Sequence, residues 1–173
     1  MRQAALLVWL MLGLLLMTGD GRAAPSAITR IEVHKEPHLM QLFAGDVEVA
    51  RFNVWIGPGG RGVKRREGDK VTPVGHYHVS RRSPSVDYDI FLGIDYPNAE
   101  DRARFADAKA ARALPLGATI GGDVGIHGGS PETWETASDG EDWTLGCVSV
   151  RSSEIERIAP LVRVGTPVEI ADE

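Results

Sequence analysis

Cys147 is the only cysteine in the chain, and it lies in the segment Thr-Leu-Gly-Cys-Val-Ser-Val at residues 144–150. Upstream of it lies His127, which two glycines follow. A cysteine becomes a useful nucleophile when a histidine within hydrogen-bond reach removes its proton and later returns it. Gly146 allows a tight turn, in which the backbone N–H groups of Gly146 and Cys147 can point at a developing oxyanion. These residue types indicate an acyl-transfer site with Cys147 as nucleophile and His127 as base.

The same residues also have a purely structural interpretation, because a buried cysteine and a histidine in a turn are both common. Spacing alone leaves the two interpretations open. An exported protein normally uses its thiols in pairs, and a single cysteine cannot form an internal disulfide, which favours chemistry. If His127 activates Cys147, the pKa of the thiol is expected to lie below the value of about 8.5 for a free cysteine.

The N-terminus has the pattern of an export signal. A short basic start, Met-Arg-Gln, precedes an almost wholly apolar run at residues 4–17, and small residues follow up to Ala23. The run is shorter than the about 20 residues that span a bilayer, so residues 1–23 are expected to be a signal peptide cleaved after Ala23, with an uncleaved N-terminal anchor as the alternative. No cysteine follows the run, so lipoprotein anchoring is not expected. Residues 24–173 are then expected to form one domain in the periplasm or cell envelope, with no integral membrane part of its own.

The net charge of −5 argues against nucleic acid as a partner. A local exception is a basic cluster at residues 61–66, Arg-Gly-Val-Lys-Arg-Arg, in a glycine-rich loop. This cluster is interpreted either as a solvated loop or as an electropositive rim for an anionic ligand. His76 and His78 would share one face of a strand, but no third ligand accompanies them. We therefore expect neither a metal site nor a cofactor.

Short runs of alternating apolar and polar residues dominate the chain and predict strands. The predicted strands cover residues 28–34, 39–43, 47–56, 71–80, 91–96, 124–127, 148–150 and 168–170. Two segments indicate helices: residues 98–113, which start with an Asn cap, and residues 153–162, which start with the capping-box pattern Ser-Glu-Ile-Glu. Many short strands with one or two short helices predict a mainly β fold, a sandwich or barrel.

Three motifs carry a resemblance to a known family. His127–Gly128, followed by Thr-Leu-Gly-Cys at residues 144–147, resembles the catalytic signature of the L,D-transpeptidase family, also called the YkuD domain. The Gly-Asp-Lys-Val-Thr-Pro-Val-Gly-His-Tyr of residues 68–77 resembles the family's Gly-Asp-x-x-Thr-Pro-x-Gly-x-Tyr segment. The Tyr-Pro-Asn of residues 96–98 resembles a family segment that precedes a helix. The resemblance extends over residues 28–170.

The resemblance implies a YkuD-like β-sandwich or barrel, with residues 24–173 as a catalytic domain that acts on peptidoglycan stem peptides and so on cell wall organisation and cell shape. Cys147 would be the acylated nucleophile, His127 the base and later the acid, and the carbonyl of Gly128 the group that orients the imidazole. Gly146 and Cys147 would supply the oxyanion donors. The acceptor is left open. A stem amine would give a crosslink, a lysine of an envelope protein would give an anchored protein, and water would make the enzyme an L,D-carboxypeptidase or endopeptidase.

The residues expected to contact substrate are Thr144, Arg151, Gly129 and Trp143. Many family members have arginine two positions after the cysteine, where this chain has Ser149, and Arg151 would face the same side of a strand. Gly129 permits close approach of a substrate backbone. Trp143 either forms an aromatic wall for a peptide or packs in the interior, and Thr144 either contacts substrate or bonds within the cysteine loop.

A second interpretation remains from a different class of protein. Leu145 stands where many family members have histidine, and Ser149 stands where many have arginine. These departures are compatible with a non-catalytic envelope module that binds peptidoglycan or a partner protein in the same groove. Trp134, like Trp143, lies between the histidine and the cysteine and would serve either kind of groove.

Overall fold

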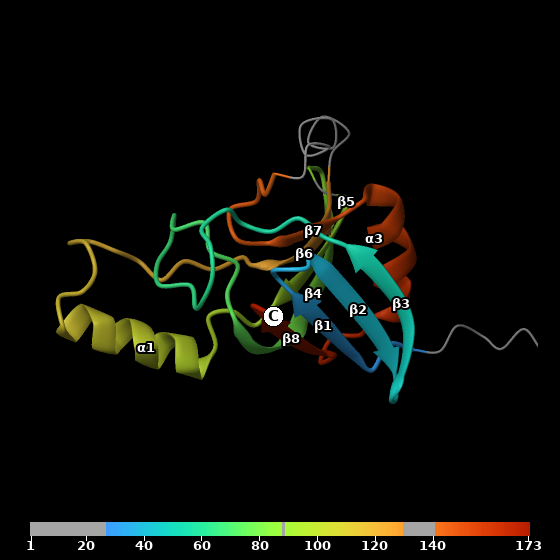
Figure 1. Cartoon of the computed structure of the whole chain (residues 1–173), viewed down its shortest axis with the longest axis horizontal. Helices are drawn as coiled ribbons and strands as arrows, with labels where there is room; N and C mark the ends of the chain where they lie inside the picture. The colour runs from blue at the N-terminus through green and yellow to red at the C-terminus, as the bar shows by residue number, and fades with distance from the viewer. Residues whose placement is uncertain (1–26, 88, 130–140) are drawn as a thin grey trace, which may run out of the picture.

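The computed structural model describes residues 27–87, 89–129 and 141–173, and Figure 1 shows their arrangement. The strands are β1 (Arg30–His34), β2 (Leu39–Ala44), β3 (Val47–Asn53), β4 (Gly75–Ser85), β5 (Asp89–Ile94), β6 (Gly125–Gly128), β7 (Val148–Val150) and β8 (Pro167–Ala171). The helices are α1 (Ala99–Ala110), α3 (Ser152–Ile158) and the short 3-10 helix η1 (Ala159–Leu161). The described residues therefore form the mainly β protein with short helices that the sequence predicts, and that fold class is confirmed.

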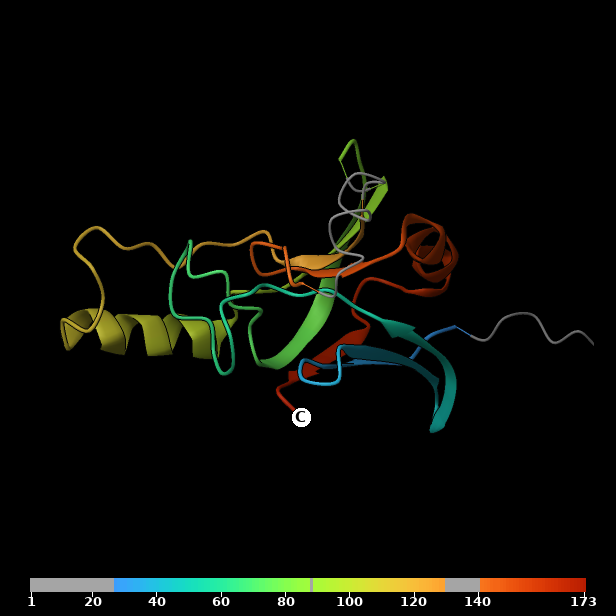
Figure 2. The same cartoon turned by 45° about the horizontal axis from the view of Figure 1, so that its top comes forward.

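The described strands form one sheet in the order β3-β2-β1-β8-β4-β5-β6-β7. The β1–β8 and β6–β7 pairs are parallel, and the other neighbours are antiparallel. Strand β4 belongs to both halves of the sheet, because residues 75–78 pair with β8 and residues 79–85 pair with β5. The register shifts between Val79 and Arg81, and such a bulge bends a strand. Figure 2 shows the two halves as layers joined by the curved β4.

The hydrophobic core lies between these layers. One layer contributes alternate residues of β1, β2 and β8, and the other contributes alternate residues of β4 to β7. Fully buried strand residues in this core include Ile31, Val33, Met40, Leu42, Val79, Leu92, Ile126, Val148 and Ile170. Removing one such side chain from water stabilises the fold by roughly 1.5–3 kcal/mol. Because side chains alternate along a strand, the neighbours of Leu92, Ile126 and Val148 face the outside of their layer, where the cleft described below lies.

The helices begin close to where the sequence predicts them. Asn98 caps α1, and its side-chain oxygen accepts the N–H groups of Glu100 and Asp101. The second helix begins with Ser152 rather than Ser153, and Glu154 accepts the N–H of Arg151 at its start. Its prediction was wrong by a residue at this end, because the chain turns into the helix directly from β7. No helix among the described residues is both long and apolar enough to cross a membrane.

Two predicted strands have different limits in the structure. Residues 71–74 do not pair in β4, because loop contacts hold them: the side chain of Asp69 accepts the N–H of Val71, and Thr72 accepts the N–H of Gly57. Residues 54–56 leave β3, since Trp55 instead forms an isolated bridge with Ser149 of β7. Both exceptions bring loops against the strand that follows Cys147.

Candidate active site

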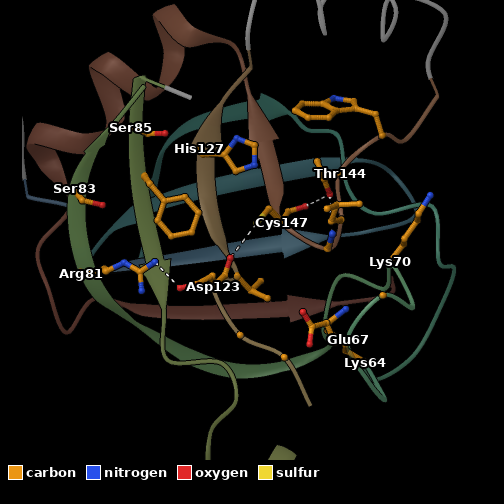
Figure 3. A pocket seen from close by; sticks show the side chains of 18 of the residues that line it. Lys64, Glu67, Lys70, Arg81, Ser83, Ser85, Asp123, His127, Thr144 and Cys147 are labelled. Atoms are coloured by element: carbon orange, nitrogen blue, oxygen red, sulfur yellow. Dashed lines mark hydrogen bonds and ion pairs between the residues drawn. The ribbon is translucent and has the colours of Figure 1, made fainter. Parts of the chain in front are cut away.

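The sheet register brings the histidine and the cysteine to one face. His127 of β6 pairs with Phe91 of β5 on one side and with Ser149 of β7 on the other. Cys147 lies two residues before Ser149, so its side chain points to the same face and it is a diagonal neighbour of His127. Figure 3 shows both side chains at the same cleft.

Hydrogen bonding fixes the protonation form of the buried His127 ring. Its Nδ1 lies 2.6 Å from the carbonyl oxygen of Gly128, which can only accept, so Nδ1 carries the proton and Nε2 is left as a base. The ring stacks on Phe91 with centroids 6.1 Å apart and meets Trp143 edge-on at 5.9 Å. Burial lowers the pKa of His127, although the bond to Gly128 opposes this in part. The ring is therefore held as a neutral imidazole.

The Cys147 thiol is half-buried, and its Sγ donates to the carbonyl oxygen of Asp123 at 3.6 Å. Burial raises the pKa of this thiol, while the amide of Gly125 and the ammonium of Lys64 lower it in part. The expectation of a pKa below that of a free cysteine is therefore wrong. Burial disfavours both charged forms, so the resting pair is a neutral thiol beside a neutral imidazole. Poor reactivity of the resting thiol consequently does not separate an enzyme from a binding module.

Two hydroxyl groups hold the peptide plane after Cys147. The carbonyl oxygen of Cys147 accepts from Thr144 Oγ1 at 2.7 Å and from Thr72 Oγ1 at 3.3 Å. The Thr144 hydroxyl also accepts the N–H of Gly146 at 3.2 Å. Of the two roles expected for Thr144, the structure therefore has the bonds within the cysteine loop. The N–H of Gly146 is used inside this loop, whereas the N–H of Cys147 donates to no acceptor among the described residues.

Gly146 is expected to tolerate no side chain. Its φ of 130° is unfavourable for other residues, and an added Cβ would lie 2.8 Å from the backbone oxygen of Val71, which cannot move aside alone. Gly146→Ala should therefore displace the cysteine loop and lower kcat/KM by about 100-fold or more, since a shift of about 1 Å has that effect. Gly60→Ala is the matched control, because Gly60 also has a positive φ (89°) but has open space around its Cβ position.

Steady-state kinetics and thermal unfolding of both variants test this expectation. Backbone strain should lower the stability of both variants by roughly 1–3 kcal/mol, and the clash with Val71 should lower that of Gly146→Ala further. Only Gly146→Ala should lose turnover. Equal turnover in the two variants would show that the loop does not need its observed conformation.

A cleft of about 800 Å³ lies over the outer face of β4 to β7. His127, Trp143, Thr144, Gly146 and Cys147 line it, so the structure brings these five predicted residues together. Its charged lining consists of Lys64, Glu67, Lys70, Arg81 and Asp123 (Figure 3). The exposed side chain of Leu145 adds an apolar group close to Cys147.

The basic cluster at residues 61–66 divides into parts with different surroundings. Arg61 forms exposed ion pairs with Glu36 and Glu173, as a solvated loop would. Lys64 is buried instead, and its Nζ lies 2.5 Å from Asp69 Oδ1. Asp69 also accepts the backbone N–H groups of Arg65, Arg66 and Val71, which organises the turn. Lys64 is the only member of the predicted cluster among the described residues that line the cleft, where it lies beside Gly146.

Other predicted residues lie outside the cleft. Gly129 bonds through its N–H to the carbonyl of Val150, and its own carbonyl accepts the hydroxyl of Ser152, so its backbone joins β7 to α3. Arg151 is an exposed residue at the start of α3. Neither residue is among the described residues that line the cleft. Trp134 lies outside the described residues, and within them no cluster of ligand residues could hold a metal ion.

Comparison with known proteins identifies the family. The profile of the YkuD family, described as the L,D-transpeptidase catalytic domain, matches residues 28–170. The chain belongs to this family. The resemblance carried by the histidine and cysteine motifs is therefore confirmed over the whole described core.

Solved structures share the fold of this L,D-transpeptidase family member. A mutant of the helical cell shape determining protein Pgp2 from Campylobacter jejuni has a TM-score of 0.62 at 21% identity, over 86% of this chain and 49% of that one. Bd1075 from Bdellovibrio bacteriovorus has a TM-score of 0.57 at 21% identity, over 86% and 49%. An L,D-transpeptidase from Xylanimonas cellulosilytica has a TM-score of 0.54 at 14% identity, over 84% and 61%. The chain thus spans about half the length of the first two. No curated protein matches it.

Proposed function

We propose that the protein is an exported cysteine L,D-transpeptidase that acts on peptidoglycan stem peptides through a thioester on Cys147. Membership of the L,D-transpeptidase family supports peptidoglycan as the substrate. The observation that carries the proposal is the placement of the Cys147 thiol and the neutral His127 imidazole on one face of the sheet, at one cleft. A structural cysteine would need neither an open cleft nor an oriented base.

The neutral pair leads to a defined reaction sequence. As the Cys147 sulfur attacks the carbonyl carbon of the L-centre in a donor stem, Nε2 of His127 takes the thiol proton. The tetrahedral intermediate then collapses, the bond to the following D-residue breaks, and His127 gives its proton to the departing amine. The acyl group remains on Cys147 as a thioester. An incoming amine or water attacks this thioester, gives its proton to His127 and releases the product and the free thiol.

Negative charge on the intermediate needs donors close to Cys147. The N–H of Cys147 is the natural donor, because it donates to no acceptor among the described residues. The hydroxyls of Thr144 and Thr72 hold the carbonyl group of the same residue in place. The N–H of Gly146 could join it only if Thr144 released its bond. Lys64 adds a buried positive charge on the same side, which favours the anionic intermediate.

Export is the second part of the proposal. Residues 1–23 serve as a signal peptide or N-terminal anchor, and residues 24–173 form the catalytic domain in the periplasm or cell envelope. Peptidoglycan lies on that side of the cytoplasmic membrane, so the location follows the substrate. A fusion of residues 1–23 to a reporter that is active only after export would test this placement.

The acceptor decides which reaction of the family the protein performs. Defined tetrapeptide stems are incubated with the protein, with and without an added acceptor stem amine, and the products are separated and weighed by mass spectrometry. A crosslinked dimer supports transpeptidation, and a shortened stem with or without the amine supports hydrolysis. Intact donor under all conditions would contradict the enzyme proposal and favour the binding module.

The pH dependence of kcat/KM should reflect the neutral pair. Burial lowers the pKa of His127, so its Nε2 stays available below the ordinary histidine value of about 6.5, and activity is lost only as the pH falls through the lowered pKa. Burial raises the pKa of Cys147, so the free thiolate appears only above the ordinary cysteine range. A profile measured from about pH 4.5 to about pH 10 should therefore show a broad plateau. An acid limb at or above about pH 6.5 would contradict this description.

A further inference from the structure

One row of residues crosses the sheet from β4 to the nucleophile. In the register, Arg81 of β4 pairs with Gly93 of β5, and Gly93 pairs with Gly125 of β6. Ile126 pairs with Val148, so Gly125 lies opposite Cys147. Two successive glycines thus separate Arg81 from the nucleophile on the cleft face. Glycine inside a strand often marks a site where another group approaches the backbone closely.

The space over the two glycines is occupied. A Cβ on Gly93 would lie 2.9 Å from Cγ and 3.3 Å from Cζ of Arg81, and a Cβ on Gly125 would lie 2.7 Å from the Phe91 ring. The Arg81 guanidinium lies 5.0 Å from the centroid of that ring. A register shift directly precedes Arg81, and bulges of this kind beside active sites often change the direction of a side chain. The side chain of Arg81 therefore runs across the face of the sheet toward Cys147.

Asp123 fills the gap between the guanidinium and the thiol. Its Oδ1 accepts from Arg81 Nη2 at 2.9 Å, and its main-chain carbonyl accepts from Cys147 Sγ at 3.6 Å. Figure 3 shows the two contacts as successive dashed lines. The Asp123 side chain is nevertheless 85% exposed, and that of Arg81 is 50% exposed. An exposed ion pair of this kind is weak and easily exchanged.

The covalent structure of Asp123 matches that of a donor peptide. Its carbonyl carbon is joined to its carboxylate carbon through Cα and Cβ. In a donor stem with one residue after the scissile bond, the reacting carbonyl carbon is joined to the terminal carboxylate carbon through the amide nitrogen and Cα. The same number of bonds therefore separates the two groups in both cases.

We propose that Asp123 occupies the leaving-group subsite of the free protein, and that a donor's terminal carboxylate replaces it on Arg81. This inference rests on the proposed function, and it assigns the specificity for the C-terminus of the donor to Arg81. Donors must then end in a free carboxylate one residue after the scissile bond. A donor with a blocked or longer C-terminus places no carboxylate at Arg81. Such a donor lacks the charge-assisted, bidentate hydrogen bonds that a guanidinium makes with a carboxylate.

Binding to the Cys147→Ala protein tests the inference without turnover. Two stem tetrapeptides are compared by calorimetry, one with a free C-terminal carboxylate and one with a C-terminal carboxamide. The carboxylate peptide should bind about 10- to 100-fold more tightly. Adding Arg81→Gln should reduce this ratio to about threefold or less, and adding Arg81→Lys should retain part of it. Adding Lys70→Gln removes one positive charge from the same cleft and should leave most of the ratio in place.

Asp123→Asn provides an independent readout. Asn tolerates the positive φ of 53° at this position and keeps the main-chain carbonyl, but it removes the competing charge. The carboxylate peptide should bind several-fold more tightly to this variant, whereas the carboxamide should not. Equal binding of the two peptides, no detectable binding, or a ratio that survives Arg81→Gln would overturn the inference. Turnover by the wild-type protein separately tests the proposed function, so the two failures are distinguishable.

Discussion

Cys147→Ala should abolish turnover of stem peptides, with a loss of kcat/KM of about 10⁴-fold or more, because the proposed acyl intermediate is a thioester and Cys147 is the only cysteine in the chain. The fold should persist. Thr144 and Thr72 hold the Cys147 main chain through its carbonyl oxygen, and the substitution leaves those bonds in place. The thiol itself makes weak contacts, with the carbonyl of Asp123 and the amide of Gly125.

Two measurements together check this prediction. Product release from a defined tetrapeptide should fall to the uncatalysed rate, while the thermal unfolding midpoint should stay within about 2 °C of wild type. Cys147→Ser is the matched variant, because it keeps a nucleophilic atom at this position. The pKa of a serine hydroxyl is much higher than that of a thiol, so a neutral histidine removes its proton poorly. Substantial activity in the alanine variant would place the chemistry on another residue.

His127→Asn should lower kcat/KM by about 10²- to 10⁴-fold at neutral pH. Asparagine can still donate to the carbonyl of Gly128 from near the Nδ1 position, but it offers no base at the Nε2 position. The thiol would then have to lose its proton to solvent, which the raised pKa of Cys147 makes difficult. The variant therefore removes the base at Nε2 while it keeps the hydrogen bond to Gly128.

The pH dependence of the His127→Asn defect distinguishes a base from a packing residue. Phe91 and Trp143 contact the ring, so a substitution also disturbs the wall of the cleft. If His127 serves as a base, the acylation defect should shrink as the pH rises, because hydroxide then removes the thiol proton. A defect of constant size across the pH range would mean that the ring acts only by filling space.

The sequence predicts the position of the site better than its electrostatics. The strands around His127 and Cys147 have short, strongly apolar patterns, and local pattern alone places both residues at strand ends. The family motifs then relate residues that are distant along the chain. The pKa of the Cys147 thiol depends on burial by several loops at once, and no local pattern reports this.

Lys64 was indicated only within the basic cluster at residues 61–66, and Arg81 and Asp123 were missed for a related reason. Their positions depend on strand register and on a bulge, which a single sequence specifies weakly. The sequence nonetheless contained a signal, because Gly93 and Gly125 lie within predicted strands. A glycine inside a strand often marks a place where another group approaches the backbone closely. Arg151, by contrast, was expected to continue the strand after Ser149, but β7 ends at Val150 and Arg151 is the N-cap of α3, and it is not among the described residues that line the cleft.

The most direct test of a thioester on Cys147 is the mass of the intact protein after incubation with a donor stem tetrapeptide or a carbapenem. Wild type should gain the mass of one acyl group, and fragmentation should locate that group on Cys147. Cys147→Ala should gain none, and His127→Asn should gain it far more slowly. Equal labelling of the alanine variant, or an acyl group on any other residue, would contradict the mechanism.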